Sequence, residues 1–144
     1  MALRSEAADV HALRAEVRRA GLRATAARIA ILQALRRATA PVSHADMEAL
    51  FTGRGWDRTT FYRNLLDLAR AGLARRTDLG DHTWRFEAVQ PGQDGDPHAH
   101  FVCGSCGVVE CLDDVRISVG KAAPRALRER HVEIQVRGTC DRCS

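Results

Sequence analysis

The sequence lacks several features that would point to other classes of protein. Residues 1–19 contain no continuous apolar run, so we expect neither a signal peptide nor a membrane span, and a cytoplasmic location follows by default. There is no Ser/His/Asp set, phosphate-binding loop or His-Glu-x-x-His motif, and there are no internal repeats or low-complexity runs. These absences argue against an enzyme and against a small organic substrate. A metal-dependent hydrolase is the rival class to consider.

Charge is distributed unevenly along the 144 residues. The net charge is +4, with 15 basic against 10 acidic residues in positions 1–90 and 7 against 8 in positions 91–144. The first part is therefore the candidate for contact with a polyanion. The length suffices for one domain or two small ones.

Four of the five cysteines form two Cys-x-x-Cys knuckles, whose members are Cys103, Cys106, Cys140 and Cys143. Four thiolates are the donor set of a structural Zn2+, and glycines beside the knuckles let the backbone turn tightly. A pair of disulfides, or thiols that never meet, is the alternative, but cytosolic thiols stay reduced. The interval 107–139 exceeds the common spacing and must contain structure of its own.

Helical periodicity and capping residues predict four helices in the first part of the chain. They cover 9–20, Thr25 to about Ala38, a third segment opened by Ser43 with Asp46 completing a capping box, and Asp57 to Gly72. The last two have the order of a helix-turn-helix. Residues 73–89 then alternate around a Gly-Asp turn, which predicts a β-hairpin that would form a wing.

The remaining chain predicts a second, smaller domain. Residues 90–97, QPGQDGDP, have the composition of a hinge. Strands are expected at HFVC, VVECL and VEIQV, with a helical stretch around 113–129. We therefore expect an α+β protein with a winged helix-turn-helix domain at 1–89 and a small α/β domain at 98–144.

Polar residues gather at the start of the fourth helix, where a recognition helix meets base edges. They include Arg58, Thr59, Thr60, Tyr62 and Arg63. Arg63 can reach guanine in a bidentate manner, Tyr62 suits a thymine methyl or a phosphate, and the threonines suit phosphates. An amphipathic helix with a solvated face is the alternative. Three further arginines, in the wing and before the second helix, favour DNA: Arg75, Arg76 and Arg23.

These motifs, in this order from about residue 10 to the end, resemble the ferric uptake regulator (Fur) family of metal-responsive repressors. The matching segments are Gly21-Leu22-Arg23-x-Thr25-x-x-Arg28-x-x-Ile31-Leu32, Thr59-Thr60-Phe61-Tyr62-Arg63-Asn64-Leu65, Ala71-Gly72-Leu73, Arg85-Phe86-Glu87, His98-x-His100-x-x-Cys103-x-x-Cys106-Gly107 and Cys140-x-x-Cys143. The resemblance implies a winged-helix domain, a hinge and a zinc-stapled dimerisation domain. It also implies a homodimer that binds palindromic operator DNA when loaded with metal. Tyr62 and Arg63 would read bases, and Arg23 would reach the minor groove.

A second metal site is expected upstream of the first knuckle. His98 and His100 alternate by two, so on a strand their side chains leave the same face. With Glu87 and Glu110 they suit Fe2+, Mn2+ or Zn2+, and by resemblance these four positions form the regulatory site. Because Glu87 precedes the hinge, bound metal would clamp it. Two exposed histidines near a turn are the alternative.

Other residues bear on the identity of that metal. Many relatives have a histidine before the third helix, where this chain has Pro41; His44 or His82 could substitute. An accessory site of some relatives is expected to be absent, because Pro97 and Ala99 occupy its positions.

Glu87 resembles an iron sensor, whereas zinc-sensing relatives often have Cys there and peroxide-sensing relatives Asp. Cys111 beside Glu110 could supply a soft ligand for zinc or be a semi-buried hydrophobe. His131 is interpreted as structural or solvated. Alternatives to an iron-responsive repressor are a zinc-sensing or a peroxide- or manganese-sensing member, and a zinc-ribbon interaction module that never contacts DNA.

Overall fold

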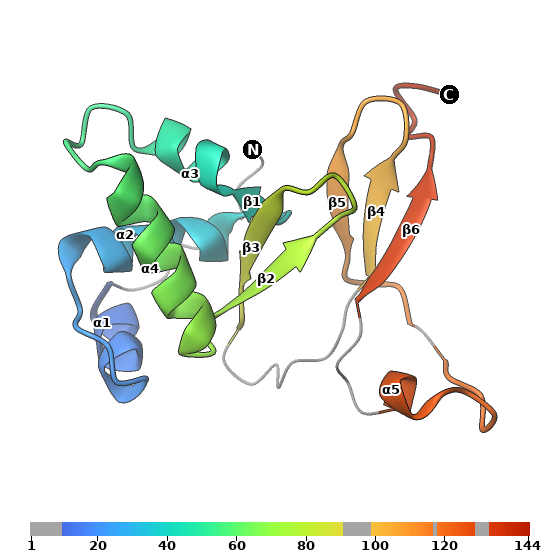
Figure 1. Ribbon diagram of the computed structural model, residues 1–144, viewed down its shortest axis with the longest axis horizontal. Coiled ribbons are helices and arrows are strands. Elements are labelled where there is room, and N and C mark those ends of the chain that lie inside the picture. The colour runs from blue at the N-terminus through green and yellow to red at the C-terminus, as the bar shows by residue number, and fades with distance from the viewer. Residues whose placement is uncertain (1–9, 91–98, 117, 129–132) are drawn as a thin grey trace. The chain divides into compact units, whose positions relative to one another are not determined.

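A computed structural model describes residues 10–90, 99–116, 118–128 and 133–144 of the protein (Figure 1). The chain divides into two compact units, Met1–Gly92 and Gln93–Ser144. This division lies within residues 90–97, which were expected to form a hinge. Most of that stretch, together with His98 and His131, lies outside the described residues. No helix in the described parts of the chain is long and apolar enough to cross a membrane.

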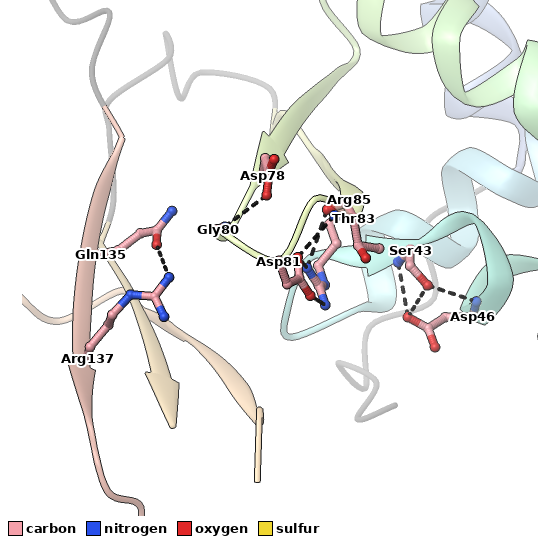
Figure 2. A network of polar contacts seen from close by, with 9 residues as sticks. All are labelled: Ser43, Asp46, Asp78, Gly80, Asp81, Thr83, Arg85, Gln135 and Arg137. Carbon is pink, nitrogen blue, oxygen red and sulfur yellow. Dashed lines mark hydrogen bonds and ion pairs between the residues drawn. The ribbon is translucent and has the colours of Figure 1, made fainter. Parts of the chain in front are cut away.

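Four helices lead the first unit, and three of them begin at the predicted caps. They are α1 (Val10–Arg19), α2 (Ala26–Arg37), α3 (His44–Leu50) and α4 (Arg58–Arg70). The side chains of Thr25 and Asp57 accept hydrogen bonds from backbone N–H groups three residues further on. Ser43 and Asp46 form the predicted capping box (Figure 2). Each cap supplies partners for N–H groups that the first helical turn cannot pair.

A three-stranded antiparallel sheet of order β1-β3-β2 completes the first unit. Strands β2 (Ala74–Asp78) and β3 (Trp84–Ala88) form the predicted hairpin. The short strand β1 (Val42–Ser43) also pairs with β3, and the sequence did not predict that pairing. Together with α3 and α4, the sheet makes the predicted winged helix-turn-helix.

The hydrophobic core of the first unit is built from the inward faces of the helices and the sheet. Its buried members are Leu13, Val17, Ile29, Ile31, Leu32, Leu35, Val42, Met47, Phe61, Leu65, Leu68, Leu73, Ala74 and Phe86. Burying one large apolar side chain stabilises a fold by about 1.5–3 kcal/mol. Because Phe61, Leu65 and Leu68 fix the inner face of α4, its polar face is held toward solvent.

The second unit is a three-stranded sheet with little helix. Strands β4 (Ala99–Cys103), β5 (Val109–Leu112) and β6 (Ile134–Gly138) have the order β5-β4-β6. The β4–β5 pair is antiparallel and the β4–β6 pair is parallel. A parallel pair needs a long crossover connection, which here includes the single-turn helix α5 (Arg125–Arg128).

The prediction of a helical stretch over 113–129 is wrong for most of that range. Among the described residues of this range, only Arg125–Arg128 are helical, and the others are turns or irregular. Gly120 and Pro124 interrupt the apolar periodicity on which the prediction depended. Proline suits only the start of a helix, and α5 begins directly after it.

Candidate metal centres and nucleic-acid interface

The two Cys-x-x-Cys knuckles meet at one end of the second unit's sheet. Cys103 ends β4, Cys106 lies in the following turn, and Cys140 and Cys143 follow β6, which pairs with β4. Their sulfur atoms all lie within 4.8 Å of one another, and Sγ of Cys106 is 3.7 Å from Sγ of Cys140. Sulfurs bound to zinc at about 2.3 Å in a tetrahedron are about 3.8 Å apart. The four residues therefore fit a tetrahedral Zn2+.

The backbone around the knuckles favours thiolates. The backbone N–H groups of Cys106 and Cys140 point at Sγ of Cys103 and lower the pKa of that thiol to about 6. Hydrogen bonds with the thiols of Cys140 and Cys106 raise the pKa of Cys143 to about 12, because they favour its protonated form. Gly107, at φ +72°, donates to the carbonyl of Cys103 and tightens the turn. A bound cation is thus the partner that would keep all four sulfurs deprotonated.

All five cysteines carry free thiols, so the disulfide alternative does not describe this structure. A disulfide would require sulfurs about 2.05 Å apart, far closer than the Cys106–Cys140 pair. The fifth cysteine, Cys111, lies on β5 and is not part of the four-sulfur cluster.

The pairing of β4 with β5 determines which candidate ligands of the second unit lie on the same face of the sheet. His100 lies directly opposite Cys111, whereas Glu110 lies opposite Phe101. Because neighbouring residues of a strand face opposite sides of a sheet, His100 shares a face with Cys111 and not with Glu110. The ligand atoms of His100 and Cys111 lie within 4.8 Å of each other, and Glu110 is exposed. The structure thus brings His100 together with Cys111, the alternative donor named from the sequence, and not with Glu110.

Glu87 lies on β3 of the first unit, opposite Arg75 of β2. Its carboxylate oxygen Oε1 is 3.6 Å from Nη1 of Arg75, and its side chain is 9% exposed. A buried carboxylate is costly unless a cation lies nearby, and the guanidinium of Arg75 meets that need. The ion pair thus offsets part of the cost of burying this carboxylate.

The two accessory histidines lie elsewhere in the first unit. Nε2 of His44 is 3.0 Å from the carbonyl oxygen of Arg58, and its ring meets the ring of Tyr62 edge-on, with centroids 6.1 Å apart. His82 is exposed in the loop between β2 and β3, at φ 58°. Among the described residues, no group of three or more closely spaced metal donors includes His44, His82 or Glu110. His44 instead contacts the first turns of α4, through the carbonyl of Arg58 and the ring of Tyr62.

The first turns of α4 present the predicted polar face. Arg58, Thr59, Tyr62 and Arg63 are exposed, and Thr60 is half-buried. Asp57 caps the helix through the N–H of Thr60 at 2.6 Å, and this hydrogen bond lowers the pKa of the carboxyl.

Arg28 connects this helix to the loop that carries Arg23. Its Nη2 is 2.5 Å from Oδ2 of Asp67 on α4, and its Nη1 donates to the carbonyl oxygen of Arg23 at 2.9 Å. The side chain of Arg28 is only 12% exposed. Our sequence reasoning assigned Arg28 no role, although the Thr25-x-x-Arg28 spacing was visible. The arginine fixes the exposed Arg23 relative to the polar face of α4.

The two wing arginines differ in their surroundings. Arg75 is paired with Glu87, whereas the guanidinium of Arg76 lies 3.9 Å from the centroid of the Trp84 ring. Arg76 and Trp84 are both exposed, so this stacked pair is available to a partner. The loop at the tip is held by Arg85, whose two terminal nitrogens donate to Asp81 at 2.8 and 2.7 Å (Figure 2).

Known proteins resemble this chain in both fold and sequence. The description of the ferric uptake regulator family matches residues 19–136. The transcriptional regulator FurA of Mycobacterium tuberculosis is 31% identical over 140 aligned positions, and the match covers 90% of this chain and 88% of FurA.

Solved structures give the same result for the fold. The ferric uptake regulator of Pseudomonas aeruginosa with manganese superimposes with a TM-score of 0.60 at 25% identity, over 89% of this chain and 97% of that one. A zinc uptake regulator complexed with zinc and DNA has a TM-score of 0.62 at 17% identity, over 93% of this chain and 91% of its own. The chain belongs to the ferric uptake regulator family of metal-responsive transcriptional regulators.

Proposed function

We propose that the protein is a homodimeric repressor that binds palindromic operator DNA when a divalent metal occupies its regulatory site. The observation that carries the proposal is the exposed Arg58, Thr59, Tyr62 and Arg63 face on a capped helix, next to a basic wing. The zinc uptake regulator of similar fold, solved with zinc and DNA, supports the same reading. Members of this family are transcriptional regulators, which removes the hydrolase alternative.

The DNA contacts divide into base-reading and phosphate-binding residues. Arg63 and Tyr62 project from the second turn of α4 and would read base edges in the major groove. Arg58, Thr59 and Thr60 precede them and suit phosphates. Arg23 lies in the loop before α2 and would reach the minor groove. The wing would contribute Arg76 and also Arg75, which is paired with Glu87.

A homodimer is favoured by the composition of the second unit. Its buried apolar residues among those described are only Ala99, Val102 and Cys103. Its exposed large hydrophobic residues are Val115, Val119, Leu127 and Val136. A unit with so small a core needs a metal, a partner or both. We infer that structural Zn2+ at the four-cysteine cluster and a second copy of the chain supply this stability, and that a two-fold dimer presents two α4 helices to a palindrome.

The regulatory metal would take ligands from both sides of the hinge. Glu87 precedes residues 90–97 in the chain, and His98 and His100 follow them. One ion bound to all three would restrict the hinge. In a dimer it would favour one arrangement of the DNA-binding units of the two subunits. Metal then acts by linkage, since it stabilises the arrangement to which it binds more tightly. The cognate ion depends on the fourth donor, for which β5 offers Cys111 or Glu110.

DNA binding is tested by one arginine substitution and a matched control on the same helix. Duplexes selected from a random pool by the wild-type protein serve as probes, with a scrambled duplex for comparison. Arg63→Ala should weaken specific binding by about 1–3 kcal/mol, because a bidentate base contact is lost. Arg70→Ala removes another exposed arginine, from the last turn of α4, and should have a smaller effect. If the wild type selects no duplex over the scrambled one, the zinc-ribbon interaction module is favoured. Equal binding by Arg63→Ala and wild type, with zinc content unchanged, would exclude Arg63 as a base-reading residue.

Metal dependence is tested with fully reduced protein that retains its tightly bound zinc. Addition of Zn2+, Fe2+ or Mn2+ at buffered free concentrations should tighten operator binding by about 5–150-fold, the usual range of allosteric coupling. If none of the three ions changes the affinity, the switch proposal is wrong even though the protein binds DNA.

A further inference from the structure

We propose that Cys111 is a ligand of the regulatory metal and that its thiolate makes the site selective for Zn2+ over Fe2+ and Mn2+. This inference deepens the proposed function and rests on it. It starts from the register of the second unit's sheet, in which His100 pairs with Cys111 and Phe101 pairs with Glu110. Directly opposite residues of an antiparallel pair have Cβ atoms about 4.5–5.5 Å apart on one face, so one ion can bridge them.

Glu110 cannot complete the same set without a change of register. A shift of one residue would move every side chain of β5 to the other face. The register is held by the turn between the strands, where Cys103 donates its N–H to the carbonyl of Val108 at 2.9 Å. Because Cys103 also belongs to the four-sulfur cluster, zinc bound there would fix this turn. The cluster thereby determines which β5 residue faces His100.

The surroundings of the pair suit a metal site. His100 is 3% exposed and Cys111 is half-buried, so their donors are shielded from bulk water. Cys111 is separate from the cysteines of the four-sulfur cluster.

The donor chemistry decides which metal the site prefers. With Glu110 on the opposite face, the donors that the described strands of the second unit bring together are the imidazole of His100 and the thiolate of Cys111. A site of two imidazoles and two carboxylates suits Fe2+ and Mn2+, whereas a thiolate is a soft donor that favours Zn2+. The general affinity order of divalent ions, in which Zn2+ lies above Mn2+ and Fe2+, acts in the same direction. The thiolate beside His100 favours zinc over the iron expected from Glu87 alone.

Cobalt provides a direct probe of the thiolate. The reduced, full-length protein is loaded with one equivalent of Zn2+ for the four-cysteine cluster and then titrated with Co2+ without oxygen. The wild type should develop a thiolate-to-cobalt charge-transfer absorption. Cys111→Ser should bind Co2+ without that absorption, while Glu110→Gln, its neighbour on the other face, should retain it. Retention of the first zinc equivalent by each variant verifies that the second unit is folded.

Metal selectivity provides the second readout. Competition with chelators should show that Cys111→Ser loses about 10-fold or more in Zn2+ affinity, since loss of even an outer partner costs about 10–100-fold. Cys111→Glu should shift the preference toward Mn2+ and Fe2+. Charge-transfer absorption that survives in Cys111→Ser, or Zn2+ affinity lost in Glu110→Gln alone, would overturn the inference and leave metal-dependent DNA binding intact. The reverse result, a cobalt–Cys111 bond without any effect of metal on DNA binding, would contradict the switch and support the ligand assignment.

Discussion

The two units of the chain reach stability by different means. Of the buried apolar residues in the described parts, 16 lie in the first unit and 3 in the second. The first unit is held by hydrophobic burial between helices and a sheet. The second has a four-sulfur cluster at one end of its sheet, and several of its large apolar side chains are exposed.

This difference separates recognition from regulation. A unit with a dense core keeps the polar face of α4 rigid whatever the metal supply, as a DNA-reading surface requires. The second unit has almost no core in its described residues, so the bound metal and second chain that we propose would supply its order and make it the part that metal controls. The predictions below test this contrast.

Loss of the four-cysteine site should have the largest effect. Cys143→Ser, or removal of zinc by a strong chelator, should unfold the second unit, because a structural zinc contributes on the order of 10 kcal/mol. The other buried apolar residues described in this unit, Ala99 and Val102, cannot replace it, since full burial of even a valine side chain contributes only about 1.5–3 kcal/mol. Hydrogen exchange should show protection lost in β4 and β6 and kept in α2 and α4. Cys111→Ser, the matched control outside the cluster, should keep protection in both units. Persistent protection of β4 in zinc-free protein would show that the second unit has stability of its own.

A core substitution should produce the opposite pattern. Phe61→Ala should lower the free energy of unfolding of the first unit by about 3–5 kcal/mol, because Phe61 is 1% exposed within the core. Tyr62→Ala, at the next position and 48% exposed, should cost less than about 1 kcal/mol. Urea denaturation followed by helical circular dichroism measures both, with zinc content unchanged. Loss of zinc from Phe61→Ala would mean that the two units do not fold independently.

The features predictable from sequence were those with local causes. The starts of α2, α3 and α4 follow from Thr25, Ser43 and Asp57, whose side chains cap helices within three residues of their own positions. The β2–β3 hairpin follows from its Gly-Asp turn. The strand β1 was missed because a two-residue pairing with β3, more than 40 residues away, leaves no local pattern.

The metal centres show the same limit at the level of single residues. Cys-x-x-Cys spacing was enough to name the four sulfur donors, which the fold then brings together. Which of Glu110 and Cys111 faces His100 depends on the register of β5, and that register depends on the length of the turn after Cys103. A one-residue difference in the length of this turn would move every side chain of β5 to the other face of the sheet. Periodicity in the sequence alone cannot give that length. Arg28 was missed for a related reason, since its partner Asp67 lies 39 residues along the chain.

The smallest effect should come from the wing loop, the part of the first unit that lies outside its core. Hydrogen bonds from Arg85 lower the pKa of Asp81 from 3.8 to about 2. A lowered carboxyl pKa contributes stability that is complete above about pH 4 and is lost as the pH falls through 2. Because the Asp81 side chain is 50% exposed, we expect the hydrogen bonds from Arg85 to stabilise the fold by no more than about 0.5–1 kcal/mol.

Carbon-detected NMR should find Asp81 still ionised near pH 3 in the wild type, because its pKa is lowered. In Arg85→Gln it should be largely protonated there, while Arg76→Gln, on the neighbouring strand, should resemble the wild type. Since acid also protonates thiolates and releases zinc, the second unit should lose its metal before this pair breaks. A wild-type titration midpoint of Asp81 near 3.8 would mean that the hydrogen bonds from Arg85 do not hold the tip of the wing.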